Sequence, residues 1–269
     1  MPKILNLEYE NPKTKAQFTG SMEIKNQTAD SADLYFYGEI CSSKWQEWSD
    51  DDKCPQDVAD FLNSLNGVGK INVYINSPGG DSFAGNAIYN ILKRNAASKT
   101  VYIEGVAASA ASVIAMVGNP IIMPPGAQVM IHNAWTIIMG NANDLRKEAD
   151  TLDKVSASHI EIYAENAAEG VTPEQFKAMM DAETWMDGTE AAKVFKSVKV
   201  EGERVAASID ARYFDRYKNI PEKVRQPTSK DPKPPAPPEP PEPPADDIAI
   251  KIAKVKLNLA IASTQAAAF

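Results

Sequence analysis

The spacing of hydrophobic and polar positions changes several times between residues 20 and 135. Apolar runs and short alternating stretches predict strands, whereas apolar residues that recur every three to four positions predict helices. The predicted strands are 20–27, 32–40, 70–77, 99–105 and two short strands around the Pro-Gly turn within 119–134. The predicted helices are 58–66, 83–96 and 109–118. Strands and helices that alternate in this way indicate a mainly parallel α/β sheet with right-handed crossovers.

A long helical pattern follows, from Asn143 to about residue 168, and it is long enough to project from the domain. Its apolar side is formed by Leu145, Ala149, Leu152, Val155, His159, Ile162 and Tyr163. A further helix is predicted to begin near residues 172–180. Asp187 and Glu190 then have the spacing of a capping box, which predicts the start of one more helix.

The pattern changes again near the C-terminus, and we expect three parts. These are a globular domain over 1–220, an extended proline-rich linker over 221–246 and a terminal segment over 247–269. The linker is proline and charge with almost no core-forming residue, which is typical of a polyproline-like spacer. The terminal segment is apolar and basic and fits a helix or a strand, and its alanine content favours the helix. Its role as a tethered recognition segment or as plain disorder stays open.

Composition and charge exclude several classes of function. The chain has 28 Lys+Arg against 36 Asp+Glu and a net charge of -8, with no basic stripe for a phosphate backbone, so we expect no nucleic-acid partner. No apolar run is long enough to span a bilayer and the N-terminus lacks a signal-peptide core, so we expect no membrane partner and a cytoplasmic location. Cys41 and Cys54 lack the spacing of metal ligands, which predicts reduced thiols, no metal site and no cofactor.

Two serines stand in a stretch of small residues at a predicted strand-to-helix junction. Ser109 begins the helix, where backbone N–H groups are unpaired, and the neighbouring alanines let a substrate backbone approach. Ser112 lies inside the helix, where its hydroxyl can bond back to a carbonyl one turn earlier, which predicts a structural role. Ser109 is therefore the candidate nucleophile, and it needs an adjacent base.

The chain has two histidines that could supply this base. His132 ends a predicted strand, which would bring its ring to the carboxyl edge of the parallel sheet, the same edge as Ser109. His159 lies within the long helix among apolar neighbours, so a packed or surface histidine explains it better. The sequence therefore favours His132.

A glycine-rich turn, "INSPGGDS" at residues 75–82, follows another predicted strand. Gly79 and Gly80 can adopt positive φ, which would let a peptide or a developing oxyanion approach their N–H groups. Taken alone, this motif predicts only a tight turn between a strand and a helix.

Taken together and in order, "YINSPGGDSFAGNAIYNIL", "GVAASAASVIAMVG" and "QVMIHNA" resemble the proteolytic subunits of the Clp protease, the ClpP family, over roughly residues 30–200. The resemblance implies a ClpP/crotonase-type spiral of βαβ units with a projecting handle helix, to which the Pro-rich C-terminal extension is added. It also implies serine endopeptidase activity on protein or peptide substrates, without a cofactor. Self-association into rings, heptameric and stacked in pairs through the handle, is expected as well.

The resemblance also assigns roles to individual residues. Ser109 stands at the position of the family's nucleophile and His132 at that of its general base. Glu183 stands where the family has an aspartate, with Asp181 as the substitute candidate for the acid. The remaining positions carry backbone roles: Gly80 and Ala110 in the oxyanion hole, and Gly79, Gly80, Asp81 and Ser82 along the edge that binds substrate.

Several features depart from the cellular enzymes of the family. Asn133 and Ala134 replace a usual Gln-Pro, "FKSVKV" replaces an expected glycine and aspartate, and the N-terminus differs from the loops that meet an ATP-driven unfoldase. These departures resemble ClpP-like proteases encoded beside phage capsid genes, which implies cleavage of scaffold or capsid precursors during head maturation in the host cytoplasm. Three alternatives stay open: a housekeeping Clp subunit working with an unfoldase, a crotonase-fold acyl-CoA hydratase or isomerase, and a catalytically inactive interaction protein.

Overall fold

The computed structural model describes residues 3–10, 17–24, 30–47, 49, 51–65 and 67–225. They all belong to one structural unit, Met1–Pro227. The terminal segment 247–269 and nearly all of the expected linker lie outside the described residues, so the three-part division stays a prediction.

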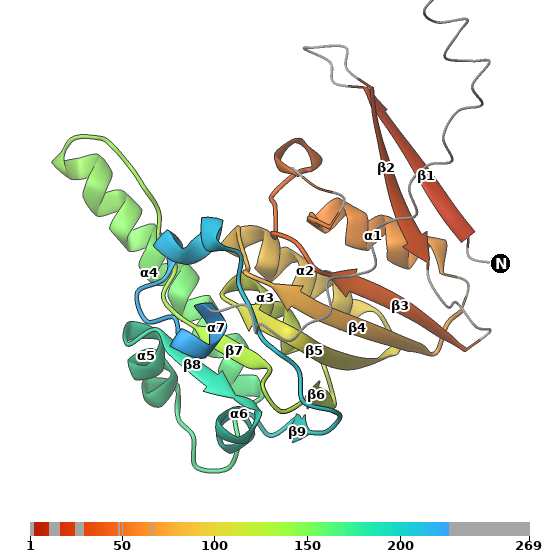
Figure 1. Ribbon diagram of the computed structural model, residues 1–269. Helices are drawn as coiled ribbons and strands as arrows, with labels where there is room; N and C mark the ends of the chain where they lie inside the picture. Colours follow the sequence, from red (N-terminus) through yellow and green to blue (C-terminus); the bar gives the residue numbers. More distant parts are fainter. Residues whose placement is uncertain are drawn as a thin grey trace, which may run out of the picture. The chain divides into compact units, whose positions relative to one another are not determined.

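A seven-stranded sheet forms the centre of the unit (Figure 1). Its parallel strands lie in the order β3 (Ser31–Phe36), β4 (Lys70–Ser77), β5 (Ser98–Ala108), β6 (Ile121–Met123) and β9 (Val198–Val200). The mainly parallel α/β sheet that the alternating pattern predicts is thereby confirmed. The predicted strand 70–77 has the bounds of β4, and its alternate residues Ile71, Val73 and Ile75 are fully buried.

Two further strands extend the sheet next to the C-terminal part of β5. β7 (Gln128–Ile131) pairs in parallel with the C-terminal part of β5, and β8 (Thr184–Asp187) pairs antiparallel with β7. β8 and β9, of four and three residues, are not predicted from the sequence.

Helices cover the sheet, and most of them lie where the apolar period places them. They are α1 (Pro55–Ser64), α2 (Ser82–Arg94), α3 (Ala110–Ala115), α4 (Ala142–Glu165), α5 (Pro173–Asp181), α6 (Gly188–Val194) and α7 (Glu222–Arg225), with 3-10 turns η1 (Lys44–Gln46) and η2 (Ala211–Arg216). α4 is the expected long helix, capped by Asn141. Asp187 caps α6 in the predicted box with Glu190. Among the described helices, none is both long and apolar enough to cross a membrane.

The N-terminal residues form a pair of strands of their own. β1 (Lys3–Glu10) pairs antiparallel with β2 (Gln17–Ile24), in a register that joins Lys3 to Ile24. The sequence analysis predicts a strand in the region of β2 but none at β1, although Leu5, Leu7 and Tyr9 alternate there with polar residues.

The apolar core of the main sheet is continuous from β3 to α6. A second apolar cluster lies against β5 and β7 and is contributed largely by residues 207–224. Its fully or nearly fully buried members are Val106, Ala108, Met130, Ala207, Ile209, Tyr213, Tyr217, Ile220 and Val224. The chain after β9 therefore folds back onto the strands that end at Ser109 and His132.

Candidate active site

Ser109 lies in the sharp turn between β5 and α3, at the carboxyl edge of the sheet. Its backbone has φ 54° and ψ −124°, a sparsely populated conformation for a residue with a side chain. Such a conformation costs about 1–3 kcal/mol and persists only where the surroundings fix it. Here the Ser109 N–H donates to the carbonyl of Met130 at 3.0 Å, and α3 begins at the next residue. The turn therefore presents the Ser109 hydroxyl outside the regular structure.

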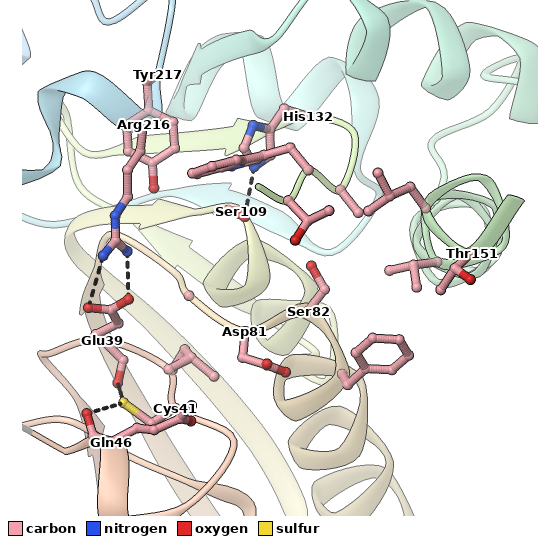
Figure 2. Close-up of a pocket in the computed structure, with 18 of the residues that line it drawn as sticks. Glu39, Cys41, Gln46, Asp81, Ser82, Ser109, His132, Thr151, Arg216 and Tyr217 are labelled. Carbon is pink, nitrogen blue, oxygen red and sulfur yellow. Dashed lines mark hydrogen bonds and ion pairs between the residues drawn. The ribbon is translucent and has the colours of Figure 1, made fainter. Parts of the chain in front are cut away.

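His132 follows β7 directly and meets Ser109 at the same edge (Figure 2). The β5–β7 register pairs Ala108 with Met130, so Ser109 and His132 leave the sheet side by side. His132 Nε2 lies 2.8 Å from Ser109 Oγ, a hydrogen-bond distance. Burial lowers the pKa of His132, the charge of Glu183 opposes this, and Lys218 adds to it, so the ring is held neutral at pH 7.

The glycine-rich turn packs directly against Ser109. Gly79 has φ 87° and Gly80 has φ 151°, and Ile40 holds the turn on its other side by accepting from the Asp81 N–H at 2.7 Å. A Cβ on Gly79 would lie 2.4 Å from the Ala108 carbonyl oxygen, and one on Gly80 would lie 2.1 Å from that of Ile40. Side chains are thus excluded at both positions by contact as well as by conformation.

Two amides near the serine are unused within the described part of the chain. Neither the Gly80 N–H nor the Ala110 N–H has an acceptor there. In contrast, the neighbouring N–H groups of Gly79, Asp81 and Ser109 each have one. Ala110 is the first residue of α3, where an N–H has no intrahelical partner. Asp81 caps α2 through the Ala84 N–H, and Ser82 is the first residue of that helix.

Glu183 approaches His132 from the antiparallel strand. The β7–β8 register pairs Ile131 with Thr184, which places Glu183 next to His132 along the ladder. Its carboxylate accepts the backbone N–H groups of Lys218, at 2.8 and 3.0 Å, and of Asn219, at 2.6 Å. Among the described contacts it has no hydrogen bond to His132. Glu183 therefore acts on the imidazole through its charge, which raises the pKa of His132.

Asp181, the substitute candidate, is an exposed residue bound elsewhere. It forms an ion pair with Lys177 at 2.8 Å and accepts from the Asn133 side chain at 2.7 Å. The Lys177 ammonium lowers the pKa of its carboxyl group, with the Asn133 bond contributing in the same direction. These contacts tie Asp181 to the residue after His132 and not to the imidazole.

Ser112 and His159 have the structural places that the sequence predicts. Ser112 Oγ donates to the Ser109 carbonyl at 2.6 Å and lies 2.8 Å from the Tyr163 hydroxyl. His159 is 3% exposed within α4, and burial lowers its pKa to about 4. Ser112 thereby links the Ser109 turn to Tyr163 of α4, whereas His159 is packed within α4.

A cleft of about 530 Å³ opens beside Ser109 and His132 (Figure 2). The residues from Gly80 to Phe83 form one side, and α4 contributes Thr151, Leu152 and Val155. The lining also includes Glu39, Arg216 and Tyr217, none of which the sequence indicated as site residues; 216 and 217 lie beyond the region of resemblance. The available signal was the recurrence of aromatic and apolar residues over 205–224, which is unusual so close to a proline-rich segment.

One group of side chains near α1 has the composition of a metal site. Ligand atoms of Glu47, Cys54 and Asp57 lie within 4.8 Å of one another. However, Asp57 accepts the Cys54 N–H at 2.8 Å and pairs with Lys44 at 3.0 Å. The helix cap of α1 and the ion pair with Lys44 account for the contacts of Asp57, so we assign no metal to this group.

The fold and the Ser–His pair define a serine-type peptidase, because a hydroxyl beside a neutral imidazole and unused amides is equipped for acyl transfer. The Clp protease family matches residues 49–194, more than half of the chain, and the chain belongs to this family. The predicted family and its α/β fold are thereby confirmed.

Curated relatives agree with this membership. The chain is 33% identical over 135 residues to "ATP-dependent Clp protease proteolytic subunit 1" of Chlamydia trachomatis serovar D, covering 49% of this chain and 69% of the relative. It is 35% identical over 121 residues to the protein of the same name from Chlamydia muridarum, covering 44% and 62%. These matches favour the peptidase over the acyl-CoA hydratase or isomerase alternative.

Proposed function

We propose that Ser109 is the nucleophile and His132 the general base of a peptide-hydrolysing site. The single observation that carries this is the 2.8 Å separation between Ser109 Oγ and His132 Nε2. As Oγ attacks the peptide carbonyl, its proton passes to Nε2, and the imidazolium then donates that proton to the leaving amine. Water repeats the sequence on the acyl-enzyme, releasing the acid and restoring the serine.

Gly80 and Ala110 form the oxyanion hole in this proposal. Their N–H groups, without acceptors among the described residues, would bind the oxyanion of each tetrahedral intermediate. The turn and the start of α2, Gly79 to Ser82, would pair with an extended peptide substrate, because Gly80, Asp81 and Ser82 line the cleft next to Ser109.

Glu183 is the acid of the site. Its charge stabilises the imidazolium, and its position beside His132 follows from the β7–β8 register. Glutamate is one methylene longer than the aspartate of the resemblance, and its carboxylate extends past the imidazole to the amides of Lys218 and Asn219.

The assembly we propose is a ring, heptameric and stacked in pairs through α4 in the manner the resemblance implies. Support comes from large apolar side chains exposed before and at the start of α4, such as Ile137 at 86% and Met139 at 95%. An exposed apolar patch of this kind fits a protein–protein contact. The sites would then face an enclosed chamber.

For the biological role we propose head maturation of a phage in the host cytoplasm, with scaffold or capsid precursors as substrates and the proline-rich tail as a recognition segment. The departures at Asn133 and Ala134 and the long C-terminal extension support it. A housekeeping subunit that works with an ATP-driven unfoldase is the second candidate, favoured by the printed name of the chlamydial relatives. A non-catalytic interaction protein is the third.

Labelling with a fluorophosphonate tests the catalytic proposal. We expect the full chain to be labelled at Ser109, and Ser109→Ala to take up no probe while keeping its melting temperature. Intact labelling of that variant would remove Ser109 from the role, and an unlabelled wild type that cleaves no precursor would favour the interaction protein.

Co-expression with the products of neighbouring genes, followed by mass-spectrometric mapping of cleavage sites, separates the two biological roles. Cleaved capsid or scaffold precursors support head maturation. Co-purification of an ATPase together with ATP-dependent degradation supports the housekeeping role.

A further inference from the structure

The segment after β9 belongs to the active site although it lies outside the family match, which ends at residue 194. Six of its side chains are buried in the second apolar cluster: Ala207, Ile209, Tyr213, Tyr217, Ile220 and Val224. They pack against Val106 and Ala108 of β5 and Met130 of β7, the strands that deliver Ser109 and His132. This packing fixes residues 216–219 next to the catalytic groups.

Tyr217 touches the base and the glycine-rich turn with one side chain. It is 7% exposed, and its ring centroid lies 5.7 Å from that of His132 at an interplanar angle of 49° (Figure 2). Trp185 packs edge-on with the same ring, and the two ring centroids are also 5.7 Å apart. The Tyr217 hydroxyl donates to the carbonyl of Pro78, the residue before Gly79. The ring is therefore fixed at both ends.

The residues on either side of Tyr217 hold further parts of the site. Arg216 binds both carboxylate oxygens of Glu39, at 2.6 and 3.3 Å, next to the Ile40 backbone that pairs with the turn. The N–H groups of Lys218 and Asn219 occupy the Glu183 carboxylate.

The Glu183 carboxylate is bound by these amides and, among the described contacts, forms no hydrogen bond with His132. Glu183 therefore does not fix the orientation of the imidazole by a hydrogen bond. An aromatic ring packed against the imidazole can do so instead, since a tilted ring pair has a preferred geometry.

We propose that Tyr217 is a positioning residue of this site: its ring orients the His132 imidazole toward Ser109, and its hydroxyl links that ring to the turn that begins at Pro78. This inference rests on the proposed roles of Ser109 and His132. It also makes Tyr217, a residue beyond the family match, a part of the site.

The imidazole has several charged or titratable neighbours whose effects must be separated from that of Tyr217. Glu183 raises the pKa of His132, Lys218 lowers it, and the charge of His132 in turn acts on His159. The Ser109 hydroxyl forms a hydrogen bond with Nε2 of His132. Tyr217 acts by covering the ring, and burial is the largest influence on the His132 pKa. Removing the ring should admit water and raise this pKa toward its ordinary value of about 6.5.

The test compares full-length Tyr217→Ala and Tyr217→Phe with wild type and with a matched control, Val224→Ala. Val224 is fully buried in the same cluster but does not line the cleft. We expect Tyr217→Ala to slow fluorophosphonate labelling by about 100-fold, as a misplaced catalytic group does, and to move the acidic limb of the pH–rate profile to higher pH. Tyr217→Phe should leave the acidic limb at its wild-type position and should slow labelling less than Tyr217→Ala does. Val224→Ala should lower the melting temperature and leave the limb in place.

NMR titration of the imidazole gives a readout that needs no activity. The chain has two histidines, and His159→Gln assigns their signals. A folded Tyr217→Ala variant with the wild-type His132 titration and the wild-type limb would overturn the proposal. A wild type that is never labelled at Ser109 would instead overturn the proposed function, and the titration would still decide whether Tyr217 controls the imidazole.

Discussion

Gly79 lies so close to Ser109 that a Cβ on this glycine would be 2.8 Å from the Cβ of the serine. The same Cβ would meet the Ala108 carbonyl at 2.4 Å. The glycine-rich turn and the serine turn, 30 residues apart in the sequence, therefore form one close-packed unit in which neither backbone can move alone.

Gly79→Ala should consequently damage both stability and reactivity. The φ of 87° strains any side-chain-bearing residue, at about 1–3 kcal/mol, and the contact with Ala108 adds to it. We expect a lower melting temperature and loss of fluorophosphonate labelling. Gly67→Ala is the matched control, because Gly67 has φ 67° but nothing within 4 Å of an added Cβ. Equal labelling losses in both variants would contradict the role of the contact.

Ser112→Ala should separate structure from chemistry. The change removes the hydroxyl that bonds to the Ser109 carbonyl and leaves the Tyr163 hydroxyl buried without this partner. A buried polar group left unsatisfied costs about 1–3 kcal/mol. We expect chemical denaturation to show this loss while labelling at Ser109 persists. Ser109→Ala should instead keep its stability and lose labelling. If labelling disappears in both variants, Ser112 takes part in the reaction.

Glu183→Gln should change the pH dependence of the reaction. The charge of Glu183 raises the pKa of His132, so its removal lowers that pKa and moves the acidic limb of the labelling profile to lower pH. The rate at neutral pH should fall, by about tenfold for each 1.4 kcal/mol of lost imidazolium stabilisation.

Asp181→Asn is the control for this variant, because Asp181 pairs with Lys177 and Asn133 instead. If the pH profile of Asp181→Asn shifts as far as that of Glu183→Gln, the role of the acid would no longer belong to Glu183 alone.

His159 should make the fold sensitive to acid. The unfolded chain protonates this residue near pH 6.5, whereas burial holds the folded pKa at about 4. The unfolded state thus binds more protons between these values, and stability falls as the pH is lowered from 6.5 to 4, by up to about 3 kcal/mol.

Urea unfolding at pH 7 and pH 5 measures this loss. His159→Gln should reduce the difference between the two pH values. The remainder includes His132, whose pKa is lowered in the same direction, and Glu47, whose pKa burial raises to about 7 and which acts in the opposite sense. An unchanged difference in the variant would exclude His159 as its source.

Several parts of the fold were predictable because each depends on neighbouring residues alone. The apolar period within 70–77 predicts β4, and the spacing of Asp187 and Glu190 predicts the cap of α6. The antiparallel β8 was not predictable, since its pairing with β7 depends on where the chain returns.

The sequence by itself determined the alternation of strands and helices from β3 to β7, and the residue types that can react at the carboxyl ends of β5 and β7. Only the tertiary structure decided that Tyr217 packs against His132, and that the carboxylate of Glu183 is taken up by the amides of Lys218 and Asn219. The reason is physical: a local pattern records which side of an element is buried, whereas the partner that buries it is chosen by packing between segments far apart in the chain.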